Sequence, residues 1–173
     1  MLPSSKLKAN ATILKRILFV CTGNIFRSAV AEYCLRHHIP EGSNIVAESA
    51  GIEAKHQTMF APVRNQLASH GINASNHRQR RVTTTILEKS NLVIAMGLDH
   101  RSVLKNRFGC NATLFYEVIT GEERPVLDIN EAIHDWKTNT ERVVEYSISI
   151  VDFVHESMPE FLKNVREILH KLD

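Results

Sequence analysis

The feature that most constrains the fold is a short, almost uninterrupted apolar run that ends in a tight turn and leads directly into a helix-forming segment. Residues 16–21 read Arg-Ile-Leu-Phe-Val-Cys, and residues 22–24 read Thr-Gly-Asn. An apolar run without polar alternation is typical of a strand buried on both faces of a parallel sheet. From Ser28 the composition is helical until Pro40, which disfavours helical backbone at the residue before it. This order predicts an α/β fold.

The rest of the chain continues the alternation of strands and helices. We expect further strands at residues 45–50, 92–96 and 112–116, and helices at 60–70 and 98–108. Strands that alternate with helices assemble into a parallel sheet with helices packed on it. The prediction is a three-layer sandwich with a central four-stranded parallel sheet and helices on both faces.

The C-terminal third is less regular. Residues 120–135 have no clear period and carry several acids. We expect a long loop over the sheet there, and long loops in compact domains are often functional. Residues 138–158 form an amphipathic pattern that Pro159 is expected to interrupt, and a last helix is expected up to Leu172.

The chain has 173 residues, of which 43% are apolar and 23% charged, so one folded domain is expected. We expect residues 1–15 to form an N-terminal leader and residues 16–173 a single domain. The leader lacks the long apolar stretch of a signal peptide, and the run at 17–21 is too short to span a bilayer. A cytoplasmic location is therefore the default expectation.

Charge and cysteine content exclude several classes of partner. A net charge of +2 is too small to indicate nucleic acid or a membrane surface. The three cysteines, at positions 21, 34 and 110, fit no disulfide framework and no zinc-binding spacing. We expect no metal and no cofactor.

The loop after the first strand is suited to bind an anion. Ligands of such folds bind at the carboxyl ends of the strands, near helix N-termini, and Cys21 and Arg27 flank this position. Gly23 and Asn24 tolerate positive φ, so the backbone can curl until successive N–H groups face inward. Such a nest, together with the positive end of a helix dipole, binds a tetrahedral anion.

The same loop carries three side chains that can bind an anion and react with it. Arg27 supplies a planar fork that can pair with two phosphate oxygens. A thiol at a helix N-terminus beside arginine loses its proton more easily, and the thiolate of Cys21 is the expected nucleophile. The Ser28 hydroxyl is placed to donate to that thiolate and to improve it as a leaving group. These residues predict a phosphate-binding loop after the first strand.

The reaction also needs an acid, because the leaving oxygen must be protonated and water must later be deprotonated. The candidates in the acidic loop are Glu122, Glu123, Asp128, Glu131 and Asp135. Asp128 follows an apolar pair that could anchor the loop near the core. We therefore expect Asp128 to be the general acid and base, with Asp135 as the second candidate.

Residues 19–32, Phe-Val-Cys-Thr-Gly-Asn-Ile-Phe-Arg-Ser-Ala-Val-Ala-Glu, resemble a family signature. The low-molecular-weight protein tyrosine phosphatases carry Val-Cys-x-Gly-Asn-x-Cys-Arg-Ser-Pro-x-Ala-Glu. Residues 48–51, 70–72, 77–82 and 94–96 resemble further blocks of the same family, so the resemblance covers nearly the whole chain from Ile17. It implies a cysteinyl-phosphate intermediate formed without a metal.

The resemblance assigns roles to individual residues. It implies that Cys21 is the nucleophile, that Arg27 clamps the phosphate and that the backbone amides of residues 22–27 cradle it. Asn24, Ser28, Ser49 and His77 match positions whose polar side chains brace the loop in the family. The substrate-binding loop residues are then Thr22, Gly23, Asn24, Ile25, Phe26 and Ser28.

The chain departs from the family pattern at four positions. Phe26 replaces a second loop cysteine, so a protective disulfide with the nucleophile should be absent. Ala29 replaces the usual proline, and Gly97 stands where many members carry a carboxylate. Ile129 follows Asp128 where the family has proline.

The aromatic wall of the substrate groove and the substrate itself remain open at this point. Trp136, Tyr116 and Phe60 are the candidates for the wall, with a core position as the alternative for Trp136. The expected substrate is a tyrosine-phosphorylated protein or a small phosphate ester, hydrolysed by a monomer or weak dimer.

Two other functions fit parts of the same pattern. A catalytically impaired phosphate-binding module is expected if Asp128 is not an acid. A thiol-dependent arsenate reductase would need further cysteines after the third strand, where Cys110 is a lone candidate.

Overall fold

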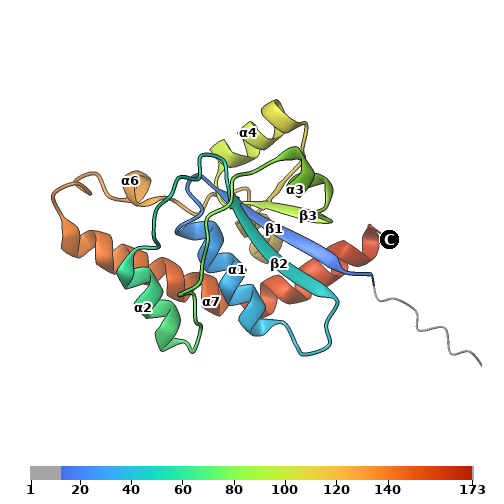
Figure 1. Ribbon diagram of the computed structural model, residues 1–173, viewed down its shortest axis with the longest axis horizontal. Coiled ribbons are helices and arrows are strands. Elements are labelled where there is room, and N and C mark those ends of the chain that lie inside the picture. Colours follow the sequence, from blue (N-terminus) through green and yellow to red (C-terminus); the bar gives the residue numbers. More distant parts are fainter. Residues whose placement is uncertain (1–12, 173) are drawn as a thin grey trace, which may run out of the picture.

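A computed structural model describes residues 13–172 of the chain (Figure 1). Four parallel strands form one sheet in the order β2-β1-β3-β4. Their bounds are β1 Lys15–Cys21, β2 Ile45–Gly51, β3 Leu92–Ala95 and β4 Thr113–Leu114. The predicted α/β fold with a four-stranded parallel sheet is confirmed.

Helices cover both faces of the sheet, as predicted. One face carries α1 Arg27–His38, α2 Ala61–Ser69, α5 Phe115–Thr120 and α7 Thr140–Lys171, and the other carries α3 Thr84–Glu88 and α4 Leu98–Phe108. The helix α6 Ile129–Ala132 lies in the connection to α7.

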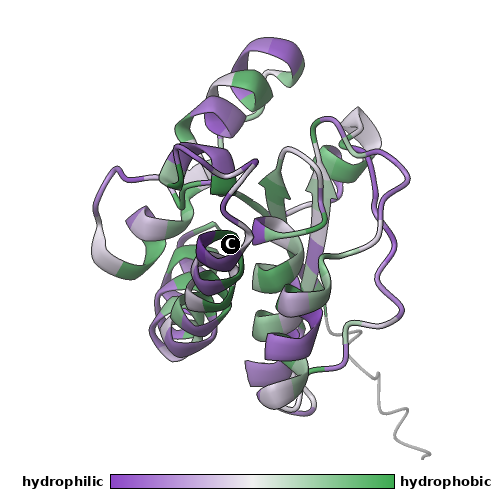
Figure 2. Ribbon diagram, turned by 90° about the vertical axis from the view of Figure 1, so that its left-hand side faces the viewer, coloured by the Kyte–Doolittle hydropathy of each residue, from purple (hydrophilic) through white to green (hydrophobic). Residues whose placement is uncertain are grey.

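The central strand β1 contributes to two separate hydrophobic cores. Ile17 and Phe19 pack in the core with α1 and α7, whereas Leu18 and Val20 pack in the core with α3 and α4. All four side chains are fully buried. In Figure 2 the strands are mostly green between helices that carry both colours. Because neither face of β1 meets water, its sequence is an uninterrupted apolar run.

Several boundaries differ from the prediction. The fourth strand ends at Leu114, and residues 115–116 begin α5 instead of extending the strand. The acidic loop contains α6, and α3 forms in a segment for which the sequence predicts no particular element. Residues 1–12 of the expected leader lie outside the described residues, and Lys15 already belongs to β1.

The C-terminal prediction of two helices is wrong, because α7 runs through Pro159 as one helix. Met158, Phe161 and Leu162 on either side of the proline are buried in the core. Tertiary packing of an amphipathic face supplies most of a helix's stability, and here it outweighs the local cost of the proline.

The sheet order places the end of β1 at a topological switch point. β1 pairs with β2 on one side and with β3 on the other, and ligands of open α/β sheets bind where the strand order reverses. The loop that follows Cys21 lies at this position. Within residues 13–172, none of the helices is long and apolar enough to cross a membrane.

Candidate active site

The loop of residues 21–28 is held in a tight curve between β1 and α1. Asn24 has φ 55°, the single positive φ among the described residues other than glycine. Gly23, expected to share this role, is not in that region. Gly51, the register partner of Cys21 in β2, closes the loop from the other side. A Cβ at Gly51 would lie 2.6 Å from the Thr22 carbonyl oxygen, so only glycine lets the loop approach β2.

The Cys21 thiol points into this curve and is 3% exposed. Its Sγ lies 2.9 Å from the Ser28 hydroxyl oxygen, and the Asn24 backbone N–H donates to it over 3.3 Å. Both groups can donate to a thiolate, and hydrogen bonds to the charged form stabilise it. The geometry thus places Ser28 where the sequence predicts it.

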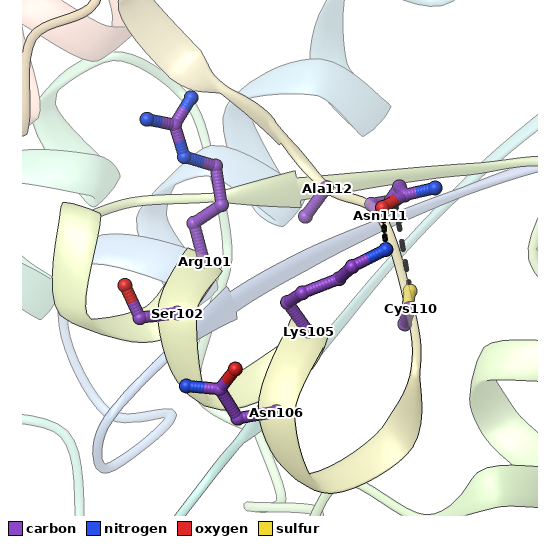
Figure 3. Close-up of a pocket in the computed structure, with 7 residues that line it drawn as sticks. All are labelled: Arg101, Ser102, Lys105, Asn106, Cys110, Asn111 and Ala112. Carbon is purple, nitrogen blue, oxygen red and sulfur yellow. Dashed lines mark hydrogen bonds between the residues drawn. The ribbon is translucent and has the colours of Figure 1, made fainter.

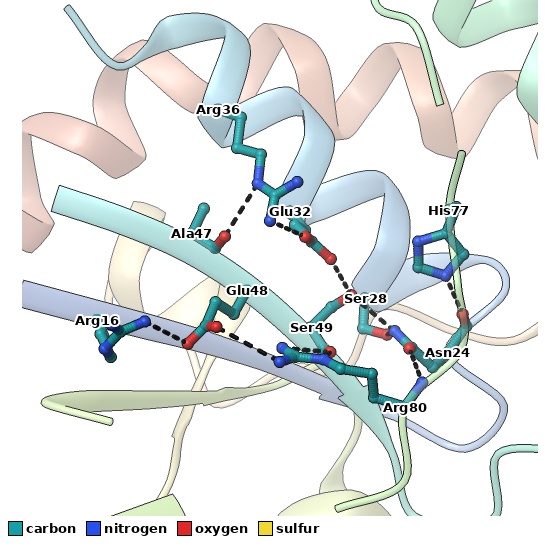
Figure 4. Close-up of polar contacts among 10 residues, drawn as sticks. All are labelled: Arg16, Asn24, Ser28, Glu32, Arg36, Ala47, Glu48, Ser49, His77 and Arg80. Atoms are coloured by element: carbon teal, nitrogen blue, oxygen red, sulfur yellow. Dashed lines mark hydrogen bonds and ion pairs between the residues drawn. The ribbon is translucent and has the colours of Figure 1, made fainter. Parts of the chain in front are cut away.

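Asn24 connects the loop to its surroundings (Figure 4). Its side-chain amide donates to the hydroxyl oxygens of Ser28, over 3.1 Å, and Ser49, over 2.7 Å. Its Oδ1 accepts from the Arg80 backbone N–H over 2.9 Å, and the His77 ring Nε2 donates to its carbonyl oxygen over 2.6 Å. Asn24, Ser28, Ser49 and His77, the four loop supports that the family resemblance implies, are therefore hydrogen-bonded to one another through Asn24.

The supporting network extends beyond those residues. Ser49 donates to the buried Glu32 carboxylate, which pairs with Arg36 over 2.5 Å. The Arg80 guanidinium donates to the Ser49 carbonyl oxygen over 3.0 Å, and the Gln79 amide donates to the Gly23 carbonyl oxygen over 2.5 Å. Sequence reasoning missed these residues. The i, i+4 spacing of Glu32 and Arg36 was a signal for one ion pair, but nothing local indicates that Arg80 reaches β2.

Arg27 joins the loop to the acidic segment. Its side chain is 3% exposed, and its guanidinium donates to the Val126 carbonyl oxygen over 2.9 Å and to Asp128 Oδ2 over 2.7 Å. A second carboxylate, Glu131, lies 3.6 Å from the same guanidinium. Tyr146 on α7 fixes the segment further, because its hydroxyl donates to the Leu127 carbonyl oxygen over 2.7 Å.

The two candidate acids are in different environments. Asp128 caps α6, where its Oδ1 accepts from the Ile129 backbone N–H over 2.8 Å, and its side chain is 33% exposed. Asp135 accepts from Asn139 over 3.0 Å and from Arg142 over 3.2 Å. These bonds, the one from Asn139 first, lower the pKa of Asp135. Its partners belong to the start of α7, whereas Asp128 contacts the loop directly.

A buried histidine behind the loop was not predicted. His100 on α4 is 1% exposed, and its Nε2 lies 2.9 Å from the Thr22 hydroxyl oxygen. Burial, and then the positive charge of Arg27, lower the pKa of His100 to about 4, so the ring is neutral at pH 7. A Cβ at Gly97, where the family pattern has a carboxylate, would lie 2.5 Å from Asp99 Oδ1 and 3.0 Å from His100 Nδ1, so a larger residue would displace these side chains.

An apolar hollow lies beside Asp128. Phe60, Ile129, Trp136 and Val143 line it together with that carboxylate. Phe60 and Trp136 are 39% and 42% exposed, so both are available to a ligand and Trp136 is not a core anchor. Tyr116, the third aromatic candidate, stacks instead on Phe153 and lies under Arg124.

A further hollow lies on α4 and the segment after it, lined by Arg101, Lys105 and Cys110 among others (Figure 3). No residue of the 21–28 loop lines it. In the described part of the chain, no group of three or more histidine, cysteine or acidic side chains is arranged to hold a metal ion.

Comparison with known proteins agrees with this geometry. The family described as low molecular weight phosphotyrosine protein phosphatase matches residues 16–168. The chain belongs to this family.

Individual relatives in the phosphatase family carry different names. A protein-arginine-phosphatase of Bacillus subtilis is 32% identical over 65% of this chain and 77% of its own length. A probable low molecular weight protein-tyrosine-phosphatase, EpsP of Ralstonia solanacearum, is 37% identical over 49% of this chain and 57% of its own length. The solved low molecular weight protein tyrosine phosphatase of T. tengcongensis superposes with a TM-score of 0.71 at 25% identity, covering 86% of this chain and 98% of that one.

Proposed function

We propose that this protein hydrolyses phosphotyrosine and related aryl phosphate esters through a phosphate ester of Cys21. The observation that carries the proposal is the convergence on one loop of a nucleophile, an anion clamp and an acid. Cys21 Sγ is hydrogen-bonded to the Ser28 hydroxyl and to the Asn24 backbone N–H, and the Arg27 guanidinium donates a hydrogen bond to Asp128 over 2.7 Å.

In the first step the Cys21 thiolate attacks phosphorus in line with the leaving oxygen. The S–P bond forms, the P–O bond breaks, and the electron pair stays on the leaving oxygen, which takes the proton of Asp128. Arg27 and the loop stabilise the charge on the equatorial oxygens. A phosphate bound to Arg27 competes with Asp128 for the guanidinium, which frees the carboxyl group for the leaving oxygen.

In the second step water attacks the phosphocysteine. Asp128, now a carboxylate, takes a proton from this water, the O–P bond forms and the S–P bond breaks. The electron pair returns to Cys21 as a thiolate that the Ser28 hydroxyl, 2.9 Å away, stabilises. The products are inorganic phosphate and the starting enzyme.

The apolar hollow favours an aryl ester. Phe60, Ile129 and Trp136 offer flat or apolar surface beside Asp128, and aromatic rings prefer stacked or edge-to-face contacts with one another. Phosphoarginine is the second candidate substrate, because the Bacillus subtilis relative is a protein-arginine-phosphatase.

A direct comparison of two substrates tests the proposal. We expect a peptide that carries phosphotyrosine to be hydrolysed with a kcat/KM at least about tenfold above that of the same peptide with phosphoarginine. Trp136→Ala should narrow this ratio, since it removes a wall of the hollow. Cys21→Ser should abolish both activities. An equal rate on both peptides, or a faster rate on phosphoarginine, would contradict the aryl preference.

A further inference from the structure

Two further surface hollows share several lining residues, and one of them adjoins the phosphate-binding loop. Both are lined by residues 56–59 and Arg64; one reaches Ile25 of the loop, and the other reaches Arg78 and Gln79. We call these two adjoining hollows the basic groove. The lining residues of the basic groove extend from Ile25 of the phosphate-binding loop to Arg78.

Residues that line the basic groove are hydrogen-bonded to the phosphate-binding loop. The Gln79 side chain donates to the Gly23 carbonyl oxygen over 2.5 Å and accepts from the Gln57 backbone N–H over 2.6 Å. His77, which also lines the groove, donates to the Asn24 carbonyl oxygen over 2.6 Å. These bonds fix the position of the groove relative to the phosphorus that the loop would hold.

The groove carries unpaired positive charge. Arg64 and Arg78 line it and are exposed, and no aspartate or glutamate is among its lining residues. Neither arginine forms an ion pair with any residue in the described region 13–172, whereas Arg27 pairs with Asp128 and Arg80 pairs with Glu48. Two exposed arginines without carboxylate partners create a local positive potential next to the active site.

We propose that the basic groove binds acidic residues that flank the phosphorylated residue, so that the substrate is a phosphorylated protein segment rich in aspartate and glutamate. The proposal rests on the proposed function and deepens it, because it adds the residues that flank the phosphorylated side chain to what the protein recognises. Arginine pairs with carboxylates through a planar fork of donors. Charge complementarity of this kind acts on encounter and on substrate binding.

The test compares two phosphotyrosine peptides of equal length, one flanked by aspartate and glutamate and the other by asparagine and glutamine. We expect the acidic peptide to have about tenfold higher kcat/KM at low ionic strength, chiefly through a lower KM. High salt should reduce this preference, because it screens exposed charges. The double variant Arg64→Gln/Arg78→Gln should remove it. Arg107→Gln, an exposed arginine at the end of α4, is the matched control and should retain it.

Two further measurements separate failure of the groove from failure of the catalytic proposal. Hydrolysis of p-nitrophenyl phosphate reports on catalysis without the groove. Binding of both peptides to Cys21→Ser, measured by fluorescence anisotropy, reports on the groove without turnover. A binding preference for the acidic peptide that the double variant loses supports the groove. Equal binding of both peptides, or a preference that the double variant keeps, overturns it whether or not the ester is hydrolysed.

Discussion

The Asp128 carboxylate makes two contacts in the structure. It accepts a hydrogen bond from Arg27 and caps α6 through the Ile129 backbone N–H. The short separation from Arg27 supports its assignment as the acid, and the cap explains how the carboxylate is held without the proline that the family carries after it. A test must therefore remove the acid while keeping the cap.

Asp128→Asn meets that requirement, because asparagine is as good an N-cap as aspartate. We expect this variant to lower kcat on phosphotyrosine by about two to four orders of magnitude, the usual size of general acid–base catalysis. Asp135→Asn is the matched control, and it should keep nearly full activity. The assignment is wrong if Asp135→Asn loses activity and Asp128→Asn does not.

His100 predicts a pH dependence of stability. Burial and Arg27 lower its pKa to about 4 in the folded state, against about 6.5 in an unfolded chain. Between these values the unfolded state binds a proton that the folded state does not, so stability is retained above pH 6.5 and lost as the pH falls toward 4. We expect the free energy of unfolding to fall by about 2–3 kcal/mol more in the wild type than in His100→Gln between pH 7 and 4.5.

Urea unfolding at the two pH values measures this difference. Glutamine can still hydrogen-bond the Thr22 hydroxyl but does not titrate, so the variant isolates the proton. Parallel losses of stability in both proteins would show that His100 does not carry the effect.

At the residue scale, the sequence predicts the site residues that lie close together along the chain. Cys21, Arg27 and Ser28 lie within one loop, so their chemistry follows from their order along the chain. His100 lies 78 positions from its partner Thr22 and Gln79 lies 56 positions from Gly23. The fold brings such partners together, and in the sequence nothing distinguishes them from other polar residues.

At the scale of elements, the observed helices and strands match the prediction where the hydrophobic pattern is strong. They differ from it where a short apolar run fits both a strand and a helix. The buried strand β1 and helix α1 match the prediction closely. Thr113 and Leu114 form a short edge strand, and its apolar neighbours Phe115 and Val118 pack on the core from α5. A short apolar run does not by itself distinguish a strand from a buried helical turn.

The uninterrupted helix α7 gives a prediction about Pro159. Proline in a helix interior removes a backbone hydrogen bond and crowds the carbonyl four residues earlier. Pro159→Ala should therefore raise the free energy of unfolding by about 1–3 kcal/mol. Thermal or denaturant unfolding measures the change. A lower stability in the variant would mean that the proline is required for the path of α7.

At the scale of the whole molecule, the fold separates the three thiols. Cys21 lies at the switch point, and Cys34 is fully buried on α1. Cys34 lies six positions beyond Ser28, the hydrogen-bond partner of Cys21, which is a rise of roughly 9 Å along the helix. No disulfide joins the cysteines of residues 13–172. Cys110 follows α4 on the opposite face of the sheet.

Mild peroxide should inactivate the protein through Cys21 without forming an internal disulfide. Burial raises the pKa of the Cys34 thiol to about 12 and raises that of Cys110, and thiols resist oxidation where thiolate is scarce. Phe26 offers no sulfur where the family pattern has a second loop cysteine. We expect peptide mapping without reductant to find oxidised Cys21 alone, with Cys34→Ser inactivated at the same rate. A Cys21–Cys34 disulfide would refute this account.

The whole-molecule arrangement also sets the limit of sequence reasoning. The alternation of elements predicts the sheet and its covered faces, and with it the position of the loop. The apolar hollow and the basic groove combine residues from α2, the segments around it, α6 and α7. Their composition depends on how these elements pack, which no local pattern encodes.

The most direct test of the mechanism is to trap its intermediate. The protein is mixed with p-nitrophenyl phosphate, whose leaving group departs without a proton, denatured in alkali within one turnover and digested for mass spectrometry. We expect one phosphoryl group on Cys21, more abundant in Asp128→Asn because its hydrolysis is slowed, and none in Cys21→Ala. Phosphate found on another residue of the wild type, or ester hydrolysis that survives in Cys21→Ala, would contradict a cysteinyl-phosphate mechanism.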